Sequence, residues 1–219
     1  MPPFILYIVT KWRLYQEERR IRSLYYSDLC FKEIDQTLLK AYRRLNPYKV
    51  SRQFLQKKGE KEIYCYGETP LTTYEKIGKE ANLKSTDRLL EFGSGRGRGV
   101  FFLSSRFGAF VKGVEWIPLF VAKARKVAEE RQVKNAVFSC EDYAQTDLKG
   151  FSVLYLYGTC LSDEEIKALC ARFRTLPKET RIITVSYPLT EYDPSFIVKK
   201  EFPLTFPWGE TTGYIQSVR

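Results

Sequence analysis

Four glycines at alternate positions form the most informative pattern in the chain: Gly93, Gly95, Gly97 and Gly99. They follow the apolar run 89–92 and precede a helical pattern, a place where glycine lets the backbone turn sharply and approach a ligand. The spacing does not match the G-x-G-x-x-G fingerprint of dinucleotide-binding folds, because Arg98 or Val100 stands where the last glycine belongs. No Gly-Lys-Ser or Gly-Lys-Thr of a P-loop occurs. The loop therefore predicts a ligand site of another kind.

Acidic residues stand at the ends of three strand-like runs. Glu91 lies two residues before the first glycine, Glu115 ends the run 109–115, and Glu141 and Asp142 follow the run 136–140. A carboxylate offers two oxygens to adjacent donors such as the hydroxyls of a ribose. Each acid alone is an ordinary strand-end residue, but their joint register makes them candidates for ligand binding.

The chain contains no histidine among its 219 residues. Imidazole is the general base of most Ser and Cys nucleophilic enzymes and the commonest metal ligand. Its absence excludes Ser-His-Asp and Cys-His hydrolases, H-E-x-x-H zincins, His-ligated zinc deaminases and facial-triad iron enzymes. The cysteines at 30, 65, 140, 160 and 170 form no C-x-x-C pair, so we predict no zinc or iron–sulfur site. Any chemistry here must proceed without imidazole.

The elements that must position these residues alternate between strands and helices. Periodicity and capping signals predict helices at 70–81, 99–107, 118–131 and 163–173, and strands at 88–92, 109–115, 136–140, 152–157 and 181–187. Thr72 and Glu75 form the T-x-x-E pattern of a capping box at the start of the first of these helices. Such alternation indicates βαβ units and a mostly parallel sheet flanked by helices, and the final runs 196–202 and 213–218 suggest an antiparallel edge hairpin.

The first third of the chain differs from the rest. Residues 1–70 carry 14 Lys or Arg against 8 acids, out of a formal net charge of +10 for the whole chain. Apolar residues there recur at helical spacing, so we divide the chain into a basic helical N-terminal extension, 1–65, and a domain, 66–219. A helical cap with a solvated basic face, nucleic-acid binding through arginines and aromatic residues, and peripheral membrane contact through residues 4–9 all remain open for the extension.

The order acidic-x-Gly-x-Gly-x-Gly, led by Glu91, resembles motif I of class I S-adenosylmethionine-dependent methyltransferases. The resemblance covers residues 66–219 and implies a Rossmann-like fold with S-adenosyl-L-methionine as cofactor. It implies that the loop Gly93, Ser94, Gly95 and Gly97 wraps the amino-acid and ribose portion, and that Glu91 receives the methionine ammonium. The segment 66–70 is similar to one that closes over the cofactor in some lysine methyltransferases of this superfamily.

Further cofactor contacts follow from the same resemblance. It assigns Glu115, at the end of the second strand, to the ribose hydroxyls, and Asp142, with Glu141 as a close second, to the adenine amino group. Trp116 is placed to pack on the adenine ring, and Tyr157 begins the segment 157–159 where the family presents its substrate-side motif.

The activity implied is methyl transfer to an acceptor left open among protein side chains such as lysine, small molecules and RNA. Catalytic residues are not identified by any motif; the candidates near the substrate side are Tyr157, Thr159, Asp163 and Tyr66. The alternative is a non-catalytic module that keeps the fold and binds a nucleotide or polyanion. An odd number of cysteines and an N-terminus without leader features predict a reducing, cytoplasmic location, and oligomeric state is left open.

Overall fold

The structure is a computed structural model that describes residues 3–219, without the side chains of residues 3–8, 10 and 11. Three helices come first: α1 (Pro3–Tyr25), α2 (Leu29–Ala41) and α3 (Pro47–Lys58). Local signals set their limits. Asp28 caps α2 through the Phe31 N–H, and Asn46 caps α3 ahead of a proline at the first helical position. The membrane contact left open for residues 4–9 falls, apart from Val9, on residues whose side chains lie outside the described ones.

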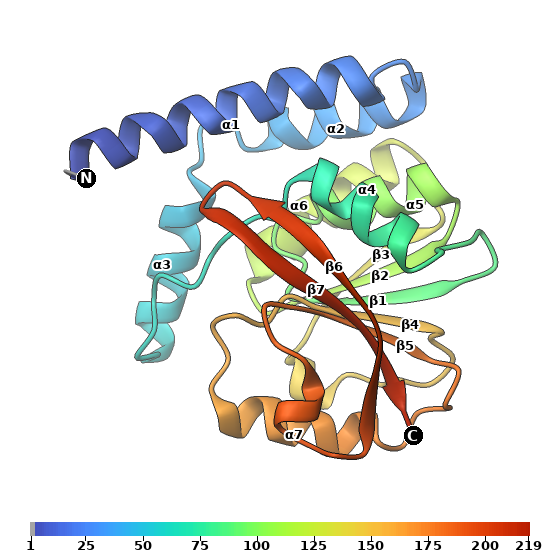
Figure 1. Cartoon of the computed structure of the whole chain (residues 1–219). Helices are drawn as coiled ribbons and strands as arrows, with labels where there is room; N and C mark the ends of the chain where they lie inside the picture. The colour runs from blue at the N-terminus through green and yellow to red at the C-terminus, as the bar shows by residue number, and fades with distance from the viewer. Residues whose placement is uncertain (1–2) are drawn as a thin grey trace.

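A seven-stranded sheet with the order β3-β2-β1-β4-β5-β7-β6 forms the centre of the molecule (Figure 1). Its strands are β1 (Arg88–Phe92), β2 (Phe110–Glu115), β3 (Ala136–Cys140), β4 (Val153–Leu156), β5 (Arg181–Val185), β6 (Phe196–Phe206) and β7 (Gly209–Val218). The first five are parallel, whereas β7 pairs antiparallel with both β5 and β6. The predicted mostly parallel sheet with an antiparallel C-terminal hairpin is confirmed.

Helices cover both faces of the sheet. On one face lie α4 (Leu71–Glu80), α5 (Arg98–Phe107) and α6 (Pro118–Glu130), and on the other lies α7 (Asp163–Phe173), which begins with a capping box of Ser162 and Glu165 (Figure 1). Short 3-10 helices occur at Tyr143–Gln145 and Leu189–Glu191. Because the chain crosses from strand to helix at one end of the parallel strands, the loops at that end gather into a common site.

Helices α1 and α2 are packed on the α4–α6 layer (Figure 1). The ring of Phe102 on α5 makes edge contacts with Tyr25 and Phe31, at centroid distances of 4.8 and 5.4 Å. These side chains belong to the same buried apolar cluster as the sheet residues on that face. The helices therefore share a core with the residues after 65.

Two sequence expectations about α4 need correction. The helix begins at Leu71, with Pro70 in the capping position and no side-chain cap, so the predicted capping box is absent. The Thr72 hydroxyl instead donates to Glu17 of α1, at 2.8 Å, and Glu75 accepts hydrogen bonds from Tyr25 and Arg106. Contacts with distant parts of the chain outcompete the local cap.

Among the described residues, no helix has the length and apolar character needed to cross a bilayer.

Candidate functional site

The glycine loop connects β1 to α5 at the carboxyl edge of the sheet. Gly93, Gly95 and Gly97 all adopt positive φ, at 71°, 55° and 82°, a region that other residues enter only under strain. A Cβ on Gly97 would overlap the ring of Phe138, whereas a Cβ on Gly93 would meet no atom within 4 Å. Gly97 is thus required by core packing, while Gly93 leaves open space beside the loop.

Glu91 is buried beside this loop with one carboxylate oxygen unpaired. Its side chain is only 2% exposed, the Tyr74 hydroxyl donates to Oε1, and Oε2 has no hydrogen-bond partner among the described residues. Burial raises the pKa of Glu91 to about 7, and the nearby Glu115 adds to the shift. The Ser94 hydroxyl oxygen is also buried without a partner. Two unsatisfied polar atoms beside an open space fit a ligand that brings its own donors.

Glu115 ends β2 opposite the loop. Its carboxylate accepts the Gly95 N–H at 2.8 Å and the Ile117 N–H at 2.9 Å. Burial raises the pKa of Glu115 to about 6, although the backbone N–H groups oppose that shift. The hydrogen bond to Gly95 fixes the carboxylate against the loop.

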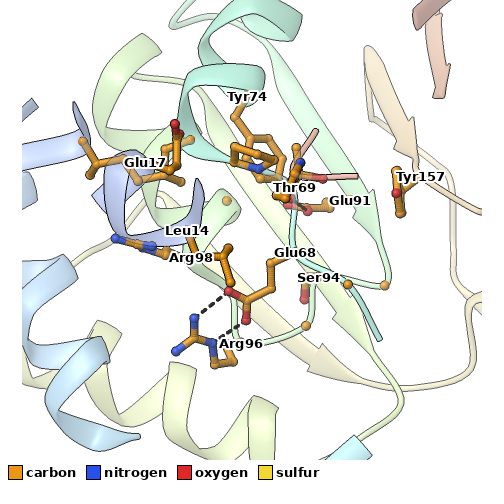
Figure 2. A pocket seen from close by; sticks show the side chains of 18 of the residues that line it. Leu14, Glu17, Glu68, Thr69, Tyr74, Glu91, Ser94, Arg96, Arg98 and Tyr157 are labelled. Atoms are coloured by element: carbon orange, nitrogen blue, oxygen red, sulfur yellow. Dashed lines mark hydrogen bonds and ion pairs between the residues drawn. The ribbon is translucent and has the colours of Figure 1, made fainter. Parts of the chain in front are cut away.

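A cleft in two parts opens around these residues. The first cavity lies among α1, the segment 67–71, Tyr74 and the loop, and includes Glu91 and Ser94 (Figure 2). The second lies among α3, residues 115–117, Tyr143 and the segment 156–161. Both cavities share five residues: Gly67, Phe92, Gly93, Gly95 and Tyr157. The two cavities therefore meet at the glycine loop.

Two arginines of the loop region are neutralised by carboxylates. Arg96 makes a bidentate pair with Glu68, at 2.5 and 2.6 Å (Figure 2). Arg98 donates to both Asp35 of α2 and Glu18 of α1, at 2.5 to 3.0 Å. Burial works against the charge of Glu68, but the hydrogen bonds from Arg96 prevail and keep its pKa below the usual value. The arginines hold the surrounding segments in place.

The residues predicted to bind adenine are placed differently from one another. Trp116 lines the second cavity and makes an edge contact with Phe54 of α3, at 5.4 Å between centroids. Asp142 is exposed and caps the Ala144 N–H at 2.8 Å, while Glu141 pairs with Lys112 at 2.8 Å. Neither acid is part of the cavity lining. Their assignment to the adenine amino group stays a prediction.

The four candidates for catalysis differ in which cavity they line. Tyr157 lines both cavities, whereas Thr159 and Tyr66 line only the second. The Tyr66 hydroxyl donates to Glu68, which ties its ring to the Arg96 pair. Asp163 begins α7 and lines neither cavity. Of the four candidates, Tyr157 therefore has the widest access to the cleft.

Several lining residues were not found from the sequence. They are Leu14, Glu17 and Glu18 of α1, Tyr74 of α4, and Pro207 of the turn between β6 and β7. No local motif marks them, because they reach the cleft from segments far from the glycine loop in the chain. For Tyr74 alone a signal existed, since a tyrosine one turn into the helix before β1 is placed to face Glu91.

Comparison of the sequence with protein-family models and with curated proteins gives no match. Solved structures do match the fold. An RNA methyltransferase from Salinibacter ruber, in complex with S-adenosyl-L-homocysteine, is 27% identical over 69% of this chain and 94% of its own, with a TM-score of 0.58.

Two further structures extend the likeness. Magnesium protoporphyrin IX methyltransferase from Synechocystis PCC 6803, with bound SAM, is 16% identical over 80% of this chain and 98% of its own, with a TM-score of 0.57. The protein MtNAS, in complex with MTA and tNA, is 19% identical over 91% and 74% of the two chains, with a TM-score of 0.58. The sheet order, the glycine loop and these likenesses agree: the chain has the class I S-adenosylmethionine-dependent methyltransferase fold.

Proposed function

We propose that this protein is an S-adenosylmethionine-dependent methyltransferase. The observation that carries the proposal is the unpaired, buried Oε2 of Glu91 beside the open space at Gly93. An ammonium group is the donor that would satisfy such an oxygen and compensate the buried charge. When bound, the cofactor supplies an electrophilic methyl group on a sulfonium, a chemistry that asks no imidazole of the protein.

The proposal gives a role to six residues of the cleft. Glu91 holds the methionine ammonium, with Tyr74 keeping its carboxylate in place, and Glu115 accepts the ribose hydroxyls. Trp116 and Tyr143 provide aromatic surface in the second cavity, at the side where the adenine would lie. Tyr157, shared by the two cavities, marks the position where acceptor and methyl group meet. The protein's contribution is mainly to align the acceptor and exclude water.

The test is cofactor binding by the Gly93→Ala variant. A Cβ at Gly93 points into the open space that the cofactor would fill, so we expect S-adenosylmethionine binding to weaken roughly tenfold or more. Positive φ adds a strain of about 1–2 kcal/mol to folding. Isothermal titration calorimetry at millimolar cofactor measures the affinity directly.

The matched control is Gly150→Ala. Gly150 also has positive φ, at 80°, and open space around its Cβ position, but it lies outside both cavities. This variant carries the same strain and should bind the cofactor like the parent protein. If the parent protein shows no binding, or the two variants lose affinity equally, the proposed function is wrong.

A further inference from the structure

The first cavity has an outer wall made by the two ends of the chain. Its lining includes Leu14, Glu17 and Glu18 of α1 and Pro207, which lies between β6 and β7. Arg13 joins these two segments, because its Nη1 donates to the Pro207 carbonyl oxygen at 2.9 Å. The α1 helix and the β6–β7 turn therefore border the first cavity together.

The lining of this cavity carries an excess of negative charge. It contains four glutamates (Glu17, Glu18, Glu68 and Glu91) and two arginines. Both arginines are already paired: Arg96 with Glu68, and Arg98 with Glu18 and the buried Asp35. An incoming phosphate would find no unpaired cation in this lining.

Glu17, at the mouth, forms no ion pair with the described residues. It accepts a hydrogen bond from the Thr72 hydroxyl, and among the described residues no cation lies within ion-pair distance of it. Arg13 and Arg20 flank it on neighbouring turns of α1 and border the adjoining surface hollow, and Arg13 keeps its charge because its partner, the Pro207 carbonyl, is neutral. Because Glu68 and Glu18 are paired and Glu91 is assigned to the cofactor, Glu17 is the glutamate of this lining that remains to pair with a positively charged acceptor.

Three aromatic rings lead from the cavity to the surface. Tyr157 stacks on Phe206 at 5.3 Å between centroids, and Phe206 stacks on Trp208 at 5.2 Å. The Trp208 indole N–H donates to the Tyr157 hydroxyl at 3.2 Å, and the Trp208 side chain is 57% exposed. Aromatic faces attract cations, and indole does so best. The acidic wall and the aromatic path favour the same kind of acceptor.

We infer that the methyl acceptor is a primary aliphatic amine on a flexible, positively charged substrate, which enters between α1 and the β6–β7 turn. This inference rests on the proposed function. Figure 2 shows Glu17 and Tyr157 on opposite sides of the cavity, so the substrate chain must extend across it. Such an amine is found on lysine side chains of a protein and on free polyamines, which share this chemistry.

The reaction balances without a further reagent. The ammonium form of the acceptor loses one proton to solvent, and the nitrogen lone pair forms the new N–C bond. The bond between the methyl carbon and sulfur breaks with its electron pair remaining on sulfur. The products are a methylammonium group and S-adenosylhomocysteine.

The experiment supplies the full-length protein with methyl-labelled S-adenosylmethionine and one acceptor at a time: spermidine, poly-L-lysine or poly(U) RNA. We expect label on spermidine or on poly-L-lysine, which distinguishes the two sources of the amine, and none on RNA. Cofactor binding is measured by calorimetry on the same preparation. Binding without transfer to either amine, or transfer to RNA, overturns the amine inference alone, whereas absence of cofactor binding overturns the proposed function as well.

Two variants test the route. Glu17→Gln keeps the hydrogen bond from Thr72 but removes the charge, and Trp208→Leu removes an exposed ring. Each should raise the KM for the amine by about threefold to tenfold while leaving cofactor affinity unchanged. Glu164→Gln, an exposed carboxylate at the start of α7, is the control. Equal KM values for Glu17→Gln, Trp208→Leu and the control contradict the route.

Discussion

At the scale of single residues, the buried carboxylate of Glu91 lowers the stability of the empty protein and favours ligand binding. A buried acid with an unpaired oxygen destabilises the empty protein once it ionises, because desolvation disfavours its charge. The same unpaired oxygen is what an ammonium ligand requires. Removing the charge should therefore have opposite effects on folding and on binding.

The Glu91→Gln variant makes this opposition measurable. The pKa of Glu91 is raised from 4.5 to about 7, so between these values the native state binds more protons than the unfolded state, and stability falls as pH rises. The loss approaches a magnitude on the order of 3 kcal/mol above pH 7. Glutamine does not titrate, so the variant should gain on the parent protein between pH 5 and pH 8 in urea unfolding, while its cofactor affinity falls at pH 8. A stability difference that does not change with pH would contradict the assignment.

The site residues that the sequence predicted are those with a local signature. Glu91, Gly93, Gly95 and Glu115 stand in fixed register with β1 and β2 and line the cleft, whereas Gly97 lines neither cavity and packs against Phe138. The position of Asp142 after β3 was the only sequence signal for it, and its side chain caps a 3-10 helix. Glu17 and Pro207 belong to opposite ends of the chain, and only the folded structure brings them together.

At the scale of elements, the pair of Arg98 with Asp35 joins the glycine loop to the N-terminal helices. Asp35 is 1% exposed, and it accepts from the Nε and Nη2 of Arg98 at 2.7 and 2.8 Å and from the Tyr26 hydroxyl at 2.9 Å. Arg98 is the first residue of α5, directly after Gly97. The position of α2 and the start of α5 are thus fixed by one guanidinium group.

Replacing Arg98 with methionine should destabilise the protein by about 3–5 kcal/mol, because it leaves the Asp35 carboxylate buried without a counter-charge. Adding Asp35→Leu to Arg98→Met removes that carboxylate and should restore much of the loss. Urea unfolding of the two variants and the parent measures both effects. A loss below about 1 kcal/mol for Arg98→Met would show that the pair contributes little.

The elements predicted most accurately are those whose bounds are set by residues close together in the sequence. The bounds of β1, β3 and α7 agree with the predicted ranges, because an apolar run or a capping box defines each. The capping box predicted for α4 failed because Thr72 and Glu75 bond to α1 and α5. The last two strands are longer than predicted, since mutual pairing extends them to Phe206 and Gly209.

At the scale of the whole molecule, one continuous apolar core contains residues from both predicted parts of the chain, 1–65 and 66–219. Phe31, Ile34 and Leu38 of α2 are buried in the same cluster as Phe102 of α5 and Phe120 of α6. Sequence periodicity predicted that the first third is helical, but it gave no information on which surface those helices cover. A boundary in composition is therefore not a boundary in packing.

Deleting residues 1–58 tests how far the remainder depends on these helices. The deletion exposes Phe102 and Phe120 to water, and leaves Arg98 without both of its partners. We expect the shortened chain to lose its cooperative thermal transition and to bind anilinonaphthalene sulfonate. A sharp transition at the parent's melting temperature would instead establish residues 59–219 as an independent folding unit.

The three tryptophans sit in three different surroundings. Trp116 lies in the second cavity next to the Lys58 ammonium, at 5.2 Å from its ring, whereas Trp208 ends the aromatic path at the first cavity and Trp12 is exposed on α1. Indole emission depends on local polarity and on nearby charge. With the other two tryptophans replaced by phenylalanine, the fluorescence of Trp116 follows occupancy of the cofactor side and that of Trp208 follows occupancy of the acceptor side. The chain thus carries its own optical probes for the order in which the two halves of the cleft fill.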